Sequence, residues 1–364
     1  MLTNPSEHII QNILSVVKKT NIKHIKSNKL SAQTIENFLI EIIEQQNYIE
    51  ENVNIFKCKS ISNINSKTLF IKEYINSIDF DYISNEIVEF IKKTGGILIK
   101  YTFNLSRKYI IYFTDHKRTL KNIPLSLSNK YDNYAKNILA VILFLENYRK
   151  IGCKTDVLEI FLYMTPFKKE LPKKDEIIGP HNINTGHTIP CRINSEIVIY
   201  RQEEFFKVTI HELIHSMGIE FNNINTEKLN KNMHSIFPID SEYRINETYT
   251  EFWTEFINIV YYLSIIFNYS LKSKNIKIMN ITEIINLFDS LYYIEKINSY
   301  IQCIKILDHM NLTYKDLISK NKEKMILYKE NSLIFAYFIC KLILIQDHNK
   351  FIEFSIKNNS NLLL

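Results

Sequence analysis

The stretch His211-Glu212-Leu213-Ile214-His215 is an HExxH pattern, and Asn246-Glu247-Thr248-Tyr249-Thr250-Glu251 follows it in the chain. Residues four apart lie on one face of an α-helix, so His211 and His215 can offer both imidazoles to one metal ion. Glu212 then lies one step round the same helix. The two stretches together indicate a metal-dependent hydrolytic site.

The third ligand of such a site is expected from the second stretch. Zinc in a catalytic site usually has three protein ligands and an exchangeable water, and two histidines with one glutamate form a standard set. Glu247 is the candidate, because a helix that starts near it can pack against the first. Glu251, one turn later on the same face, could accept the Nδ1–H of His211 and fix its tautomer. The alternatives for the third ligand are His234, in an expected loop, and Glu251 itself.

The elements around the motif predict a mixed sheet that backs the HExxH helix. Two β-rich stretches, Ile97–Phe103 and Tyr109–Thr114, are separated by a short polar loop and indicate a hairpin. The elements expected after it are a helix over 131–150, a strand over Val157–Met164, a strand over Glu196–Tyr200 and the metal helix over 202–217. Gly218 is suited to end the metal helix.

These motifs resemble those of the gluzincins, the zinc metallopeptidases that include thermolysin. The resemblance extends over residues 196–257, where NETYTE is similar to the N-E-x-x-x-D/E element of that family. It implies an α+β fold with a zincin-like catalytic domain. It also implies His211, His215 and Glu247 as ligands of one Zn²⁺, Glu212 as general base and Glu251 as a group that orients His211. Glu251 stands where aspartate is commoner, and it is longer by one methylene.

A rival zincin pattern, HExxHxxGxxH, fits the chain only in part. Gly218 matches its glycine, but Phe221 stands at the place of the last histidine and cannot bind a metal. The pattern with a downstream glutamate is therefore the better match.

Residues that bind substrate are expected on both sides of the HExxH helix. In zincins the edge strand before that helix pairs with substrate backbone, and this resemblance predicts such a role for Ile197 and Ile199. The alternative is an ordinary edge strand that another part of the chain covers. The oxyanion of the reaction needs an electrophile besides the metal. Tyr243 and Arg244 are candidates because they can share the face of Glu247, and His187 or His234 could come from loops.

Three consecutive segments are expected along the chain. Residues 1–95 predict a helical N-terminal lobe, 96–222 the zincin-like catalytic half-domain, and 223–364 a helical C-terminal lobe that carries Glu247. In the first segment, apolar residues at helical spacing follow Ser31, a possible N-cap, and a further helix over Ile83–Ile91 ends at Gly95-Gly96. In the third, Asp240 or Ser241 can cap a long helix.

Composition predicts a globular, soluble and intracellular protein. The 364 residues carry a formal net charge of only +6, without a concentrated basic patch, so neither nucleic acid nor membrane is an expected partner. The N-terminus reads as an amphipathic helix and not as a secretory signal. The 5 cysteines are odd in number and dispersed, and they are interpreted as reduced thiols of a cytoplasmic protein.

The expected function is zinc-dependent hydrolysis of a protein or peptide substrate. Two alternatives stay open: a non-catalytic protein that keeps the fold for binding or structure, and a zinc hydrolase of a non-peptide amide or ester. The segment 197–207 also resembles uncharacterised proteins of large DNA viruses, which implies a host cytoplasm or a virion as the location.

Overall fold

The chain forms two compact units in the computed structural model, which describes residues 23–52, 59–64, 83–122, 125–174, 176–220, 225–272, 279–319 and 321–358. The sheet unit takes the described residues of 41–173 and 178–220. The helical unit takes those of 1–40, 174–177 and 221–363. Helix α2 (Lys29–Glu51) is divided between the units at Ile40. These units differ from the three consecutive segments expected, because the helical unit combines residues 23–40 with residues 225–358.

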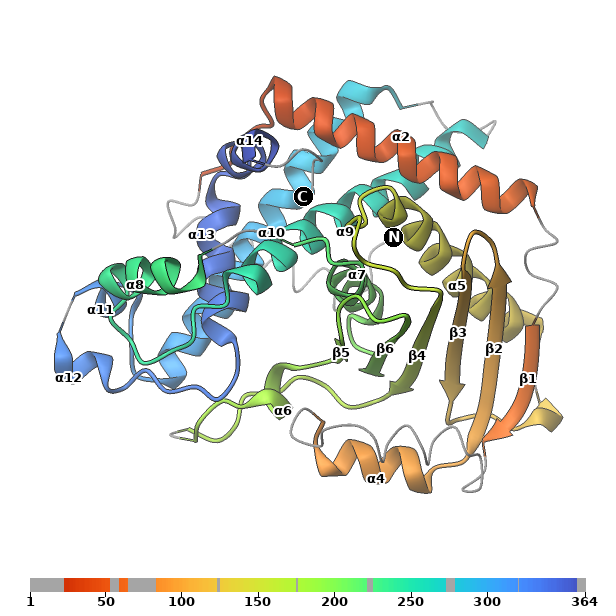
Figure 1. Cartoon of the computed structure of the whole chain (residues 1–364), viewed down its shortest axis with the longest axis horizontal. Helices are drawn as coiled ribbons and strands as arrows, with labels where there is room; N and C mark the ends of the chain where they lie inside the picture. Colours follow the sequence, from red (N-terminus) through yellow and green to blue (C-terminus); the bar gives the residue numbers. More distant parts are fainter. Residues whose placement is uncertain are drawn as a thin grey trace, which may run out of the picture. The chain divides into compact units, whose positions relative to one another are not determined.

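The sheet unit is built on a six-stranded mixed sheet in the order β1-β2-β3-β4-β6-β5 (Figure 1). The strands are β1 (Lys59–Ile64), β2 (Gly96–Asn104), β3 (Lys108–Asp115), β4 (Val157–Thr165), β5 (Gly186–Thr188) and β6 (Asn194–Arg201). Strands β3, β4 and β6 are parallel neighbours, and the other pairs are antiparallel. The expected hairpin and the strands over 157–164 and 196–200 are confirmed, and so is the α+β class.

Helices cover both faces of this sheet. On one face, Ile87 and Val88 of α4 (Asn85–Lys93) join a buried cluster that includes Val198 of β6. On the other face, Tyr134 of α5 (Leu125–Glu146) contacts Phe113 of β3, with ring centroids 6.2 Å apart. Successive strand residues point to opposite faces, so each strand supplies side chains to both layers.

The first 95 residues are not helical throughout, and this part of the prediction is wrong. Strand β1 pairs antiparallel with β2 from Lys59 to Ile64, so the segment contributes an edge of the sheet. The expected helix over 83–91 is confirmed as α4, with Ser84 as N-cap. Ser31 is not the cap of α2, because its backbone N–H donates to Asn28 Oδ1 (2.9 Å). The amphipathic pattern over 9–17 lies outside the described residues.

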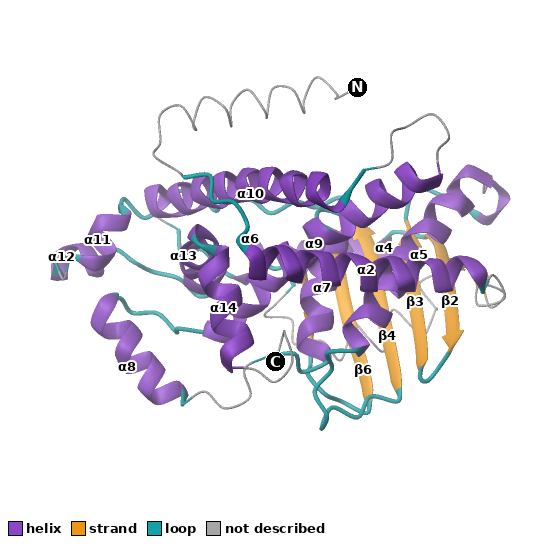
Figure 2. Ribbon diagram, turned by 90° about the horizontal axis from the view of Figure 1, so that it is seen from above, coloured by secondary structure: helices purple, strands orange, loops and turns teal. Residues whose placement is uncertain are grey.

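The regular elements of the helical unit are all helical among its described residues (Figure 2). Besides the first part of α2 they are α8 (Thr226–Ile236), α9 (Ile245–Lys272), α10 (Ile281–His309), α11 (Tyr314–Ile318), α12 (Lys322–Met325), the π-helix η3 (Phe335–Cys340), α13 (Lys341–Gln346) and α14 (His348–Asn358). Aromatic side chains fill its core. Phe252 of α9 lies 4.3 Å from Phe351 of α14, and Phe256 lies 4.9 Å from Phe288 of α10, measured between ring centroids.

The long helix α9 starts later than expected. Ser241 does not cap it, because the Ser241 hydroxyl donates to Glu330 in a loop of the same unit. Asp240 also lies well before the helix, and the N–H of Glu247 donates instead to the carbonyl of Arg244 (3.1 Å). Glu247 therefore lies in the first turn of α9. Within the described residues, no helix has both the length and the apolar character needed to cross a membrane.

Candidate metal centre

The HExxH helix α7 (Phe205–Ser216) lies in the interior of the sheet unit. All residues from Val208 to Ser216 are buried, which is unusual for a segment with two histidines and a glutamate. Val208 packs beside Gly186 of β5, where a Cβ on the glycine would meet a Val208 methyl carbon at 3.1 Å. The absence of a side chain at Gly186 thus lets β5 approach the metal helix closely.

The two histidines of the motif converge, as their spacing predicts. Their Nε2 atoms are 3.0 Å apart and their ring centroids 4.7 Å apart. His211 is 6% exposed and His215 is 9% exposed. Two imidazole nitrogens directed at one point can share a hydrogen bond or hold one cation between them.

Glu212 accompanies the pair on the same buried helix. Its side chain is 6% exposed, and an ionised carboxylate is rarely buried to this extent unless it has a partner or a function. Its charge acts on Tyr200 of β6. Burial raises the pKa of the Tyr200 hydroxyl, the charge of Arg201 opposes this rise, and the charge of Glu212 adds to it. Tyr200 therefore stays protonated next to the motif.

Glu220 is a site residue that the sequence did not indicate. Its Oε1 accepts a hydrogen bond from Nδ1 of His215, and the two side chains are 20% and 11% exposed. The two residues are five apart, a spacing that does not bring side chains together on a regular helix. The contact forms because the chain leaves the helix at Gly218, which has φ +65°. The prediction that Gly218 ends the metal helix is confirmed.

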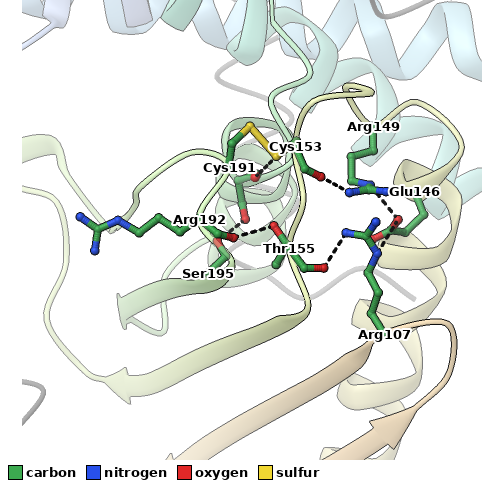
Figure 3. Close-up of a disulfide and its surroundings, with 9 residues drawn as sticks. Arg107, Glu146, Arg149, Cys153, Thr155, Cys191, Arg192 and Ser195 are labelled. Carbon is green, nitrogen blue, oxygen red and sulfur yellow. Dashed lines mark hydrogen bonds and ion pairs between the residues drawn. A yellow bond between two sulfur atoms is a disulfide. The ribbon is translucent and has the colours of Figure 1, made fainter.

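A disulfide lies directly against this turn (Figure 3). Cys153 and Cys191 are bonded across 38 positions of sequence. The interpretation of all cysteines as reduced thiols is therefore wrong for this pair. The cysteines consequently no longer support a cytoplasmic location. Cys303 and Cys340 are buried free thiols.

Hydrogen bonds connect both disulfide segments to the end of α7. The N–H of Cys191 donates to the carbonyl of Ser216 (3.1 Å), and the N–H of Lys150 donates to the carbonyl of Met217 (3.2 Å). The hydroxyl oxygens of Ser195 and Ser216 are 2.7 Å apart in the interior. The two backbone bonds satisfy carbonyls that the end of a helix leaves without intrahelical partners.

Further polar contacts fix the disulfide segments themselves, as Figure 3 shows. Thr155 Oγ1 donates to the carbonyl of Arg192 (2.9 Å), which joins the chain after Cys153 to the chain after Cys191. Arg107 donates to the carbonyl of Thr155 (2.7 Å). The C-terminal end of the metal helix is thus held by hydrogen bonds to two segments that the disulfide joins.

Glu247 belongs to the helical unit. It is half-buried in the first turn of α9, next to Thr248. The Thr248 hydroxyl donates to the carbonyl of Ala336 in η3 (3.2 Å). A π-helix leaves carbonyls outside the regular bonding pattern, and such segments are frequent at functional sites.

Glu251 lies beside a buried lysine of the same unit. The Nζ of Lys341 is 2.9 Å from Glu255, 3.6 Å from Glu295 and 4.0 Å from Glu251. The Lys341 side chain is only 6% exposed. One ammonium group therefore faces three carboxylates.

The polar groups proposed to stabilise the oxyanion are engaged elsewhere. This applies to Tyr243, Arg244 and His234. The hydroxyl of Tyr243 donates to the carbonyls of Phe237 and Ile239, and the residue is 7% exposed. Arg244 pairs with Glu242 (3.0 Å) at the surface. His234 lies in the last turn of α8 and not in a loop, and its Nδ1 is 3.3 Å from the Tyr243 hydroxyl.

The expected substrate-binding edge is also corrected. Strand β5 pairs with β6 at Thr188↔Ile197 and Gly186↔Ile199, so Ile197 and Ile199 lie inside the sheet and are fully buried. β6 is not an edge strand, because the three-residue strand β5 pairs with it on the side away from β4. His187 pairs with Val198 and shares its face, which is the face of α4 and not of α7. Burial lowers the pKa of His187 to about 4, so its imidazole is neutral.

No protein-family model, curated protein or solved structure matches the chain.

Proposed function

We propose that the protein is a zinc-dependent metallopeptidase with a zincin-like catalytic domain, holding one Zn²⁺ by His211, His215 and Glu247. The observation that carries the proposal is the 3.0 Å approach of the two histidine Nε2 atoms on a buried helix. Paired imidazoles in an apolar interior have few structural uses, and Glu212 next to them supplies the one further group that hydrolysis requires.

The donor set fits zinc. Two imidazoles and one carboxylate form a common catalytic set, and these three side chains could hold a metal ion. A tetrahedral ion with bonds of about 2.0–2.1 Å needs two nitrogens roughly 3.3 Å apart, close to the 3.0 Å observed. The Glu220 carboxylate on Nδ1 of His215 selects the tautomer in which Nε2 carries no proton and can bind a metal ion.

Bound zinc would supply a Lewis acid that polarises a carbonyl and acidifies water. Glu212 accepts the proton of the attacking water and later delivers it to the leaving amine. Glu212 is 6% exposed and directly follows His211 in the chain, so its carboxylate lies in the interior next to the proposed metal site. Glu247 acts as a ligand and Glu251 as a group that orients His211.

An extended peptide is the substrate that suits the sheet. β5 is the terminal strand on the side of β6, and its residues lie beside α7. The backbone of a peptide can add to such a strand in the antiparallel sense. Gly186–Thr188 thus replaces Ile197 and Ile199 as the proposed substrate-binding edge.

Elemental mass spectrometry of the purified protein beside Glu247→Ala tests the metal site. We expect about one zinc per wild-type chain and a sharp loss in the variant. Zinc that both proteins retain equally would move the third ligand to Glu251 or His234. A folded wild type that binds no metal would overturn the proposal in favour of the non-catalytic alternative.

Digestion of a peptide library then tests the reaction class. We expect cleavage by the zinc-loaded wild type and none by Glu212→Gln. Zinc-loaded protein that cleaves simple amides or esters but no peptide would support the non-peptide hydrolase instead.

A further inference from the structure

We propose that Glu220 is a positioning residue for His215, acting through the Nδ1 hydrogen bond to keep Nε2 available for the metal. This inference rests on the proposed metal site. It concerns a residue outside both sequence motifs, in the turn that follows α7.

The chemistry of the contact favours this role. A neutral imidazole carries one proton, so it can bind a metal through Nε2 only when the proton is on Nδ1. A carboxylate can only accept, and the Glu220 oxygen therefore selects the Nδ1–H tautomer of His215. The same hydrogen bond fixes the orientation of the His215 ring.

The backbone around Glu220 is built to hold it in place. Gly218 turns the chain in the left-handed region, and the N–H of Ile219 donates back to the carbonyl of Ile214 (2.9 Å). This bond closes a Schellman turn, which fixes the direction in which the chain leaves the helix. Bonds from Lys150 and Cys191 hold the same turn from outside.

Burial separates this pair from an ordinary surface ion pair. Exposed pairs contribute little because water and salt screen them. The side chains of His215 and Glu220 are 11% and 20% exposed, and the carboxylate is directed inward at a ring that the helix already fixes. An orienting carboxylate on a metal-binding histidine is typically worth 10–100-fold in metal affinity.

Competition of Zn²⁺ against a chromophoric chelator, with Glu220→Ala and Glu220→Gln beside the wild type, tests the proposal. We expect a 10–100-fold weaker zinc affinity for Glu220→Ala. Glu220→Gln keeps an oxygen that can accept the bond but loses the charge, so we expect a smaller loss. Circular dichroism checks that both variants fold. If Glu220→Ala does not fold, the comparison uses Glu220→Gln, because glutamine has almost the same shape as glutamate.

A second readout reports the histidine itself. In ¹⁵N-histidine-labelled, zinc-loaded protein we expect a slowly exchanging Nδ1–H resonance of His215 that disappears in Glu220→Ala and persists in Glu220→Gln. If Glu220 contributed only to folding, the Nδ1–H resonance of His215 would persist in a folded Glu220→Ala variant.

Glu204→Gln is the matched control, because Glu204 lies at the opposite end of α7, pairs with Lys169 and is 46% exposed. Its removal changes the net charge equally, and we expect zinc affinity within about twofold of wild type because exposed charges are screened. An equal loss in both glutamine variants, or an unchanged affinity in Glu220→Ala, would overturn the positioning role. A wild type that binds no zinc would overturn the metal site itself.

Discussion

The sulfur of Cys191 lies 2.7 Å from the position that a Cβ on Gly218 would occupy. Gly218 also has φ +65°, a conformation that costs other residues roughly 1–2 kcal/mol. Gly218→Ala therefore combines backbone strain with overlap on a disulfide that cannot rotate away. We expect the free energy of unfolding to fall by about 2–4 kcal/mol, measured by denaturant titration.

Gly152→Ala is the control for that variant. A Cβ on Gly152 would have no neighbouring atom within 4 Å, and its φ is not positive. The substitution reduces the entropy of the unfolded chain, so stability should be unchanged or about 0.4–1 kcal/mol higher. A fall as large as that of Gly218→Ala would show that the Cys191 contact is not the cause.

Lys341 should be essential for the stability of the helical unit. Its ammonium faces the carboxylates of Glu251, Glu255 and Glu295, with the closest contact at 2.9 Å. Lys341→Met keeps the apolar stem and removes the charge, which leaves buried carboxylates uncompensated. We expect a loss of about 3–5 kcal/mol in denaturant titration.

Lys357→Met provides the comparison at the surface. Lys357 pairs with Glu353 one turn away on α14 and is 70% exposed. Exposed pairs of this kind contribute less than about 1 kcal/mol. Similar losses in the two lysine variants would contradict the importance of the buried cluster.

The helical unit should lose stability in mild acid through His348. Burial lowers the pKa of His348 to about 4, and its Nε2 is 3.1 Å from the Ser27 hydroxyl. In the unfolded chain the same imidazole takes up a proton near pH 6.5. Between these values the unfolded state binds more protons, so the free energy of unfolding falls as the pH falls, by up to about 3 kcal/mol.

Unfolding titrations from pH 7 to pH 4 measure this dependence. His348→Gln should be less stable at pH 7 but show a shallower slope with pH. His181→Gln, which removes a histidine at the surface of the sheet unit, should keep the wild-type slope. An unchanged slope in His348→Gln would assign the acid sensitivity to other groups.

Glu212→Gln separates metal binding from catalysis. If Glu212 acts as a base and not as a ligand, the variant should retain about one zinc per chain and lose hydrolysis, by a factor of about 10² or more. Elemental analysis and a peptide-cleavage assay measure the two properties. Loss of the metal from a folded Glu212→Gln variant would place Glu212 among the ligands instead.

Local patterns predicted the elements that carry the candidate site. The hairpin and the HExxH helix have periodic apolar residues, and periodicity reports local structure directly. The convergence of His211 and His215 followed from helical spacing alone. The role of Glu247 as a ligand stays a prediction.

Contacts that depend on the path of the chain could not be predicted in this way. β1 is short and largely polar, and β5 has three residues, so neither shows a period that distinguishes a strand from a loop. The pairing of Cys153 with Cys191 has no spacing signature, since any two of the five cysteines could have met. Glu220 reaches His215 only through the left-handed turn at Gly218. The sequence predicts that this glycine ends the helix, but it does not predict where the chain goes next.

The order in which a ribosome releases the chain has a consequence for the helical unit. The N–H and hydroxyl of Ser27 donate to Asp289, and the hydroxyl also meets His348, partners 262 and 321 positions later. The described part of the sheet unit is complete once residue 220 has emerged. The segment around Ser27 can form its hydrogen bonds only after Asp289 and His348 have been synthesised. Long-range contacts of this kind form slowly, and the sheet unit can fold before they do. A nascent chain stalled after residue 260 should therefore contain a protected sheet unit and a protease-sensitive N-terminal segment.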